Sequence, residues 1–323
     1  MPQWKDAIAG AGAGAFSKTT MAPIERIKLL LQLQGSIRSK KAGGGDIPNH
    51  RQTARQVAYH VYHEEGVLAF WRGNLPNVLR TAGQAALNFA LMDYYKQIVH
   101  QALPVVLPNK FSSESESKRA KQLASSFLSG GLAGGTATTV LYPVEFLRTR
   151  LAMDQGRSVQ TRQYRGMGDV LVKTVMSDGL RGVYQGYGIA LWGSVLYRLL
   201  HLGGYDALKS EWQLFKQNSA KASAVVGEIT QQYSWAERFT LAQIVSLSAG
   251  TICYPIDSVR RRLMMQAGKA TEDRLYRNSI HCFQTIFQQE GIQGFYLGLA
   301  PNLVRSIGGA LMLVAYDALK TML

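Results

Sequence analysis

Long apolar segments with few charges alternate with polar stretches along the whole chain. Six such segments occur, near residues 4–34, 74–98, 120–155, 187–212, 232–266 and 299–321. A helix rises ~1.5 Å per residue, so each segment is long enough to cross a hydrocarbon core of ~30 Å. The first, third and fifth segments are rich in small residues and contain a proline, which predicts a kink. The pattern therefore predicts an all-α membrane protein with six transmembrane helices.

Three sequence patterns recur in one register, which indicates three tandem repeats. The first is a proline followed by an acid two residues later and a base five residues later, at Pro23, Pro143 and Pro255. The second is an acid-glycine pair and then an aromatic residue two positions before another glycine, with its first glycine at Gly66, Gly179 and Gly291. The third is an acid three residues before a lysine, at Asp93, Asp206 and Asp317. Successive copies lie 111 to 120 residues apart.

Polar stretches at residues 109–121 and 216–231 separate the repeats and are linkers by composition. We therefore predict three repeats, at residues 1–108, 109–218 and 219–323. Within each repeat a short amphipathic helix, for example at residues 53–64, is expected between the two long helices. The three repeats are expected to form one bundle with pseudo-threefold symmetry, for which a single chain is sufficient.

The charges of the chain restrict which side of each helix can face lipid. Lys and Arg number 36 against 21 Asp and Glu, a formal charge of +15, and the mean hydropathy is only -0.07. An ionised side chain that faces lipid at mid-bilayer costs at least ~2.5–3.5 kcal/mol. The repeated charges within the apolar helices are therefore expected to line a water-filled interior, which is typical of a transport path. A soluble nucleic-acid-binding protein would explain the net charge but not these charges within apolar helices.

Enzymatic and metal chemistry find no comparable support. The two cysteines, Cys253 and Cys282, form no disulfide framework or zinc motif. Residues 12–19 superficially resemble a phosphate loop, but Ser17 occupies the position where glycine is required and no strand precedes it. We expect neither an enzyme nor a metal-binding protein.

These patterns resemble the mitochondrial carrier family over essentially the whole chain. One six-residue stretch is similar to the RRRMMM signature of the family members that exchange ADP for ATP: Arg260-Arg261-Arg262-Leu263-Met264-Met265. The resemblance implies a multi-pass carrier of the mitochondrial inner membrane with both termini toward the intermembrane space. It also implies antiport of free ADP and ATP without a cofactor, bound cardiolipin, and function as a monomer.

Acids and bases of the repeated motifs are expected to form salt bridges at both ends of the bundle. In one set, which we call the matrix gate, the expected pairs are Glu25–Arg148, Glu145–Arg260 and Asp257–Lys28. In the other, the cytoplasmic gate, they are Asp93–Lys209, Asp206–Lys320 and Asp317–Lys96. Two closed gates would trap any cargo, so we expect them to open alternately. The family resemblance implies the same mechanism and adds Gln32 as a brace beneath the matrix gate.

Positions at which the repeats differ are candidates for binding substrate, because a nucleotide has no threefold symmetry. The cations of this kind are Lys18, Arg80 and Arg305 near mid-membrane, with Arg198 further toward the mouth. Side chains that merely reach to the membrane surface are the alternative. The family binds phosphate at the positions of the first three, so the resemblance implies a phosphate site.

The fourth helix is expected to hold the purine. Gly193, Ser194 and Tyr197 provide an uncharged wall, and the resemblance implies that adenine binds there. For Arg261 and Arg262 the alternatives are substrate binding and anchoring to lipid phosphates. The aromatic residues beside the repeated glycines are either an interfacial belt or parts of cardiolipin sites at helix N-termini, and we favour the latter.

Two stretches depart from the family's pattern near the substrate site. An aromatic-Pro-Thr-Gln run is replaced by residues 81–84, Thr-Ala-Gly-Gln, and a ladder of three tyrosines reads Tyr197, His201, Tyr205. A structural subunit of a larger inner-membrane complex, or a carrier of another adenine nucleotide, therefore remain alternatives to ADP/ATP exchange.

Overall fold

The computed structural model describes residues 3–34, 52–106, 114–156, 162–222, 235–269 and 271–308, which are predominantly helical and contain no strand. Five long helices cover predicted transmembrane segments: α1 (Gln3–Gln32), α4 (Asn74–Val106), α5 (Glu114–Met153), α7 (Tyr187–Ala222) and α8 (Trp235–Met264). α5 begins and α7 ends within stretches predicted to be linkers, so these two helices are longer than the sequence indicated. Residues 299–308 form the start of the sixth, whose remainder lies outside the described residues. Proline lies inside α1, α5 and α8, as expected.

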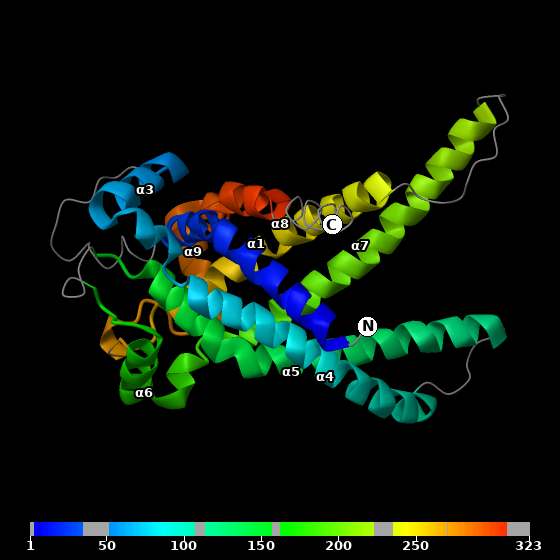
Figure 1. Cartoon of the computed structure of the whole chain (residues 1–323), viewed down its shortest axis with the longest axis horizontal. Helices are drawn as coiled ribbons and strands as arrows, with labels where there is room; N and C mark the ends of the chain where they lie inside the picture. The colour runs from blue at the N-terminus through cyan, green and yellow to red at the C-terminus, as the bar shows by residue number, and fades with distance from the viewer. Residues whose placement is uncertain are drawn as a thin grey trace.

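Shorter helices follow α1, α5 and α8 and gather at one end of the bundle (Figure 1). They are α3 (Ala54–His60) with η1 (Val61–Glu65) and η2 (Val67–Trp71), then α6 (Met167–Val183), η3 (Thr271–Asp273) and α9 (Ser279–Phe295). α3 begins at a capping box, in which Thr53 and Gln56 bond reciprocally. The predicted amphipathic helix at residues 53–64 thus continues into η1.

Three glycines of the second repeated pattern close the repeats into a ring. A Cβ atom at Gly73, Gly186 or Gly298 would lie 2.9, 3.1 or 2.7 Å from a backbone carbonyl oxygen of the next repeat. These oxygens belong to Arg148, Arg260 and Lys28, the three bases of the matrix gate. The third contact returns from the last repeat to the first, so the matrix end of the bundle has the expected pseudo-threefold arrangement.

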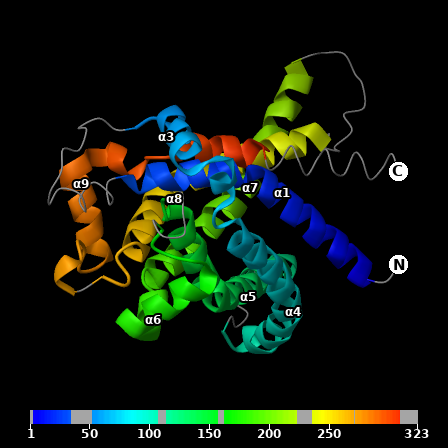
Figure 2. The ribbon, with the colours of Figure 1, turned by 60° about the vertical axis from the view of Figure 1, so that its left-hand side comes forward.

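The buried apolar core is concentrated at this end. One cluster includes Leu29, Val57 and Met153, so it joins the first repeat to the second. A second includes Phe146 and Met264, and joins the second repeat to the third. Toward the opposite end α7 diverges from α4 and α5, which stay packed against each other, as both ribbon views show (Figures 1 and 2). The bundle is therefore packed at one end and open at the other.

Among the described helices, one stretch meets a test of length and apolar composition for a membrane span. It is Phe239–Met264 in α8, with a mean hydropathy of 1.4. α1 carries Lys18, Glu25, Arg26 and Lys28, and such charges lower its hydropathy. Where these side chains point decides whether the helix can still cross a membrane.

Candidate functional site

All three predicted pairs of the matrix gate are in contact. Arg148 bonds to Glu25 Oε2, joining α5 to α1. Arg260 Nη2 lies 2.5 Å from Glu145 Oε2, and Lys28 Nζ lies 3.5 Å from Asp257 Oδ2. The side chains of the three bases are 10–13% exposed. The charged faces of α1, α5 and α8 therefore point toward one another inside the bundle.

Asp257 has further partners beneath the gate. Gln32 Nε2 donates to Asp257 Oδ2 at 3.3 Å and to Ser258 Oγ at 2.9 Å, so Gln32 lies where a brace was expected. Arg261 Nε also donates to Asp257 Oδ2, at 2.9 Å. Asp257 therefore has two basic partners, Lys28 and Arg261.

Glu25 is shared between the matrix gate and the expected phosphate site. Its Oε2 accepts from Arg148 and from Asn77 Nδ2, which lies 2.8 Å away. Its Oε1 faces the other way, 3.6 Å from Arg305 Nη1 and 3.9 Å from Lys18 Nζ. Two cations expected to bind phosphate therefore converge on a gate acid.

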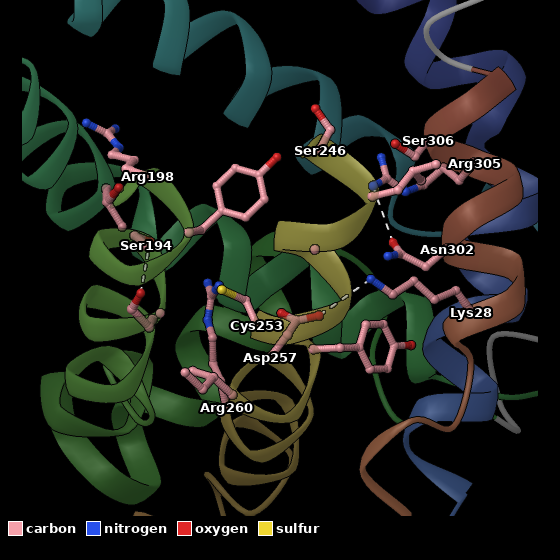
Figure 3. A pocket seen from close by; sticks show the side chains of 18 of the residues that line it. Lys28, Ser194, Arg198, Ser246, Cys253, Asp257, Arg260, Asn302, Arg305 and Ser306 are labelled. Carbon is pink, nitrogen blue, oxygen red and sulfur yellow. Dashed lines mark hydrogen bonds and ion pairs between the residues drawn. The ribbon is translucent and has the colours of Figure 1, made fainter. Parts of the chain in front are cut away.

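A cavity of about 530 Å³ lies above the matrix gate and is lined mainly by α4, α7, α8 and residues 299–308. Ser194 and Arg198 lie on one side and Asn302 and Arg305 on the other, with Cys253 of α8 between them (Figure 3). Lys28, Asp257 and Arg260 of the gate form part of its floor. Such a volume is within the range of small-molecule sites.

The expected phosphate-binding cations occupy different positions in this arrangement. Arg80 and Arg305 line the cavity, and Arg305 Nη2 also donates to Asn302 Oδ1 at 3.3 Å. Lys18 is not among the lining residues, and lies beside them at Glu25. The Nε atom of Arg80 is buried without a hydrogen-bond partner among the described residues. Arg80 is therefore a cation available to an anionic ligand.

Arg198 also lines the cavity, but its guanidinium is directed toward α5 (Figure 3). Its Nη1 donates to the carbonyl oxygen of Gly130 at 2.5 Å, and a Cβ at Gly134 would lie 1.7 Å from Nη2. The absence of a side chain at Gly134 thus makes room for Arg198. In this structure Arg198 joins α7 to α5, and direct binding of substrate by Arg198 would require this bond to break.

The three residues expected to form a wall for the purine lie on α7. Gly193, Ser194 and Tyr197 all line the cavity. A Cβ at Gly193 would lie 2.8 Å from Ile256 Cγ2, so glycine permits the close approach of α7 to α8. The Tyr197 ring stacks on that of His201 at 5.7 Å, and His201 Nε2 lies 3.0 Å from Ser246 Oγ. His201, which replaces a tyrosine of the family's pattern, thus forms a contact between α7 and α8.

The cytoplasmic gate is described only in part. Asp93 and Lys96 lie 3.9 Å apart on one helix, with side chains 85% and 54% exposed. The cation 3.9 Å from Asp93 is thus Lys96 of its own helix, and the expected partner Lys209 is half-buried on α7. Asp317, Lys320 and the side chain of Asp206 lie outside the described residues. The exposure of Asp93 is consistent with a bundle that is open at this end.

The six residues of the signature stretch are buried or half-buried at the end of α8. Arg262 is 1% exposed and forms a bidentate salt bridge with Glu290. Arg261 is 8% exposed and is bound to Asp257. Both guanidinium groups are thus bound to acids of the protein, and in this structure neither is available to lipid phosphates and neither lines the cavity. Leu263 and Met264 are buried in the core, and Met265 packs against it.

The aromatic residues beside the repeated glycines contact neighbouring helices. Trp71 Nε1 donates to the carbonyl oxygen of Thr19 at 2.8 Å. Tyr184 stacks on Tyr142, and Tyr296 stacks on Tyr254. These contacts hold the short helices against α1, α5 and α8, whether or not a lipid also binds there.

Several polar residues that line the cavity, including Gln84, Asn88 and Ser246, were given no role by the sequence reasoning, although Gln84 lies in the altered run at residues 81–84. A search for unequal charges among the repeats cannot find them, because they are neutral. The repeat register does contain a signal: Gln84 and Asn88 correspond to Tyr197 and His201, 113 residues later. Comparison of all residue types would have found these positions.

The two native cysteines offer a test that water fills the cavity. Cys253 lines the cavity, whereas Cys282 on α9 is 0% exposed. Because a thiol reacts only where the reagent can reach it, we expect a small water-soluble methanethiosulfonate to modify Cys253 at least about tenfold faster than Cys282 at neutral pH. Mass spectrometry of the membrane-embedded protein measures both rates. Cys253→Ser should remove the fast reaction; equal rates at the two thiols would contradict a hydrated cavity.

Comparison with known proteins agrees with this arrangement. A helical bundle with a cation-lined cavity above a ring of salt bridges is the arrangement expected of a membrane carrier. The model of the family described as mitochondrial carrier protein matches residues 1–103, 119–216 and 231–323. The chain belongs to the mitochondrial carrier family, and is therefore a multi-pass transporter of the mitochondrial inner membrane and not an enzyme.

The similar proteins include several translocases. ADP/ATP translocase 4 of Bos taurus is 39% identical over 327 residues, which cover 99% of this chain and 89% of that protein. ADP/ATP translocase 3 of Homo sapiens is 40% identical over 316 residues, covering 98% and 96%. ADP/ATP translocase 2 of Tachyglossus aculeatus aculeatus is 38% identical over 317 residues, again covering 98% and 96%.

Proposed function

We propose that this carrier exchanges free ADP for free ATP across the mitochondrial inner membrane. The observation that carries the proposal is the cavity above the closed matrix gate, with Arg80 available and Arg305 and Lys18 gathered at Glu25. Guanidinium groups bind phosphate oxygens in paired hydrogen bonds. The names of the similar proteins support ADP and ATP as the substrates. The cationic lining would take over the role of magnesium, so the nucleotide binds without a metal.

The position of Glu25 suggests how binding opens the matrix gate. A bound phosphate competes with Glu25 Oε1 for Lys18 and Arg305, which lie 3.9 and 3.6 Å away. When Lys18 and Arg305 turn from Glu25 to the phosphate, the charges around the salt bridge between Arg148 and Glu25 Oε2 change. A ligand shifts a conformational equilibrium only by its difference in affinity for the two states. Competition at Glu25 provides that difference, and the gates then open alternately.

The open end of the bundle corresponds to the cytoplasmic gate in this proposal, with both termini facing the intermembrane space. α1 begins at the end remote from α3, α6 and α9, which agrees with this orientation (Figure 1). Cardiolipin would bind at the starts of the short-helix segments after Gly66, Gly179 and Gly291. Residues of one chain line this cavity, so a monomer would suffice.

Exchange in liposomes tests the function. ATP carries one more negative charge than ADP, so their exchange moves net charge, at ~2.3 kcal/mol per charge per 100 mV. With ATP inside and labelled ADP outside, we expect uptake to require internal nucleotide. An interior-negative potential of ~100 mV should shift the final distribution by well over tenfold toward ADP uptake.

Three other outcomes would redirect the interpretation. Wild-type protein that exchanges neither nucleotide would support a structural subunit of a larger complex. Exchange that does not respond to the potential would contradict free ADP and ATP as the exchanged pair. Stronger competition by AMP or another adenine nucleotide would favour a carrier with a different substrate.

A further inference from the structure

Two amide side chains on α4, Gln84 and Asn88, line the cavity but belong to neither gate. Arg80, Gln84 and Asn88 are four residues apart, so they lie one turn after another on the same face of α4. Because a helix rises ~1.5 Å per residue, Gln84 lies ~6 Å and Asn88 ~12 Å beyond Arg80 along the axis. If Arg80 holds the phosphates, the ribose and base of a nucleotide can extend along this face toward the open end.

The two amides are bonded to each other and retain unused hydrogen-bonding groups. Gln84 Nε2 donates to Asn88 Oδ1 at 3.2 Å. Each amide has one acceptor oxygen and two N–H donors. The bond leaves the Gln84 carbonyl oxygen as an acceptor and the Asn88 amino group as a donor, neither of which bonds to another described residue. Turning over both amides exchanges the roles but still leaves one acceptor beside one donor.

Aromatic rings occupy the equivalent positions of the second repeat. Tyr197 and His201 lie 113 residues after Gln84 and Asn88, and their rings stack at 28°. Tyr197 lines the same cavity as the two amides. The cavity therefore offers an aromatic face from α7 and a donor–acceptor pair from α4. Nucleobases are recognised in proteins by this combination of stacking and edge hydrogen bonds.

We propose that Gln84 and Asn88 bind the edge of the nucleobase while Tyr197 contacts its face, and so determine base specificity. The inference depends on the proposed nucleotide exchange. A 6-amino purine can donate its exocyclic N–H to the Gln84 oxygen and accept from Asn88 at N7, the edge at which amides bind adenine. On that edge a 6-oxo purine presents two acceptors, O6 and N7, so in either orientation of the two amides one of these acceptors faces an amide oxygen. The pair therefore favours adenine over a 6-oxo purine.

Uptake of ADP and of inosine diphosphate by proteoliposomes tests this assignment, because inosine diphosphate has a 6-oxo purine. The wild type should prefer ADP by about tenfold. In the double variant Gln84→Leu, Asn88→Leu the ratio should fall to about one, through loss of ADP uptake, with inosine diphosphate uptake changed by less than about twofold. The ratio is measured on one sample, so it does not depend on how much protein is folded. Gln97→Leu is the matched control, since Gln97 is exposed on the same helix outside the cavity and should keep the wild-type ratio.

Two results would overturn the assignment while leaving nucleotide exchange intact. One is a double variant with the wild-type ratio; the other is wild-type protein that takes up both diphosphates equally. If the wild type takes up neither diphosphate, the proposed function itself fails, and base recognition fails with it.

Discussion

Replacing Glu25 by Gln is expected to reduce ADP/ATP exchange at least about tenfold, because removal of one partner from a buried ion pair costs several kcal/mol. Glutamine keeps the shape and the bond to Asn77 but removes the charge. Arg148, Arg305 and Lys18 then lack their common acid, and the closed matrix gate loses stability. The initial rate of exchange in proteoliposomes measures the first effect. A fall of several degrees in Tm measures the second.

Glu64→Gln is a suitable control for this variant. It is the same substitution on an exposed side chain at the matrix end of the first repeat, and should change neither rate nor Tm. A Glu25→Gln protein with wild-type exchange would exclude Glu25 as the link between substrate and gate. Arg148→Gln tests the pair directly: if Glu25 and Arg148 act together, the double variant should lose much less than the sum of the single losses.

The matrix gate could be predicted from the sequence because it depends on regular geometry. An acid and a base three residues apart on a helix face the same side, and three repeats place three such helices around one axis. Glu145–Arg260 and Asp257–Lys28 follow from that geometry alone, as the structure shows. The asymmetric contacts do not follow from it. Asn77 reaches Glu25 from another helix, and no spacing along the chain indicates this bond.

Contacts that depend on tertiary packing were predicted less well. Gly134 accommodates the guanidinium of Arg198, a contact between helices that no spacing along the chain indicates. The position of Arg262 at a helix end predicts a surface cation, but its side chain is buried and forms a salt bridge with Glu290, an acid 28 residues later. The positions of such partners are set by how α8 packs on α9, which the local pattern does not contain.

The cytoplasmic gate illustrates a different limit. Its motifs are as regular as those of the matrix gate, but Asp93 is exposed and lies near Lys96 of its own helix. If the gates open alternately, one conformation can contain only one closed set of salt bridges. A single sequence encodes both sets, so the sequence alone cannot indicate which set is formed in a given structure.

Replacing Arg80 by Ala is expected to reduce ADP/ATP exchange about a hundredfold, while Tm stays within about a degree of the wild-type value. Arg80 differs from the gate bases because it forms no salt bridge with a residue that the structure describes, and its Nε atom has no partner. Its removal therefore leaves no acid unpaired. A charge-assisted contact to phosphate contributes ~1.5–3 kcal/mol, which corresponds to about 10- to 100-fold in affinity. Loss of this contact should thus weaken substrate binding and leave the fold intact.

Arg80→Lys separates charge from geometry at this position. Lysine keeps the charge but lacks the planar group of donors that binds two phosphate oxygens at once. The rate of exchange should therefore fall about tenfold. Arg181→Ala removes an arginine that is exposed on α6, and should leave exchange unchanged. The effects on stability distinguish the two roles: Glu25→Gln lowers Tm because it leaves buried cations without their acid, whereas Arg80→Ala leaves Tm unchanged. A large fall in Tm for Arg80→Ala, or exchange at the wild-type rate, would show that Arg80 supports the bundle and does not bind the substrate.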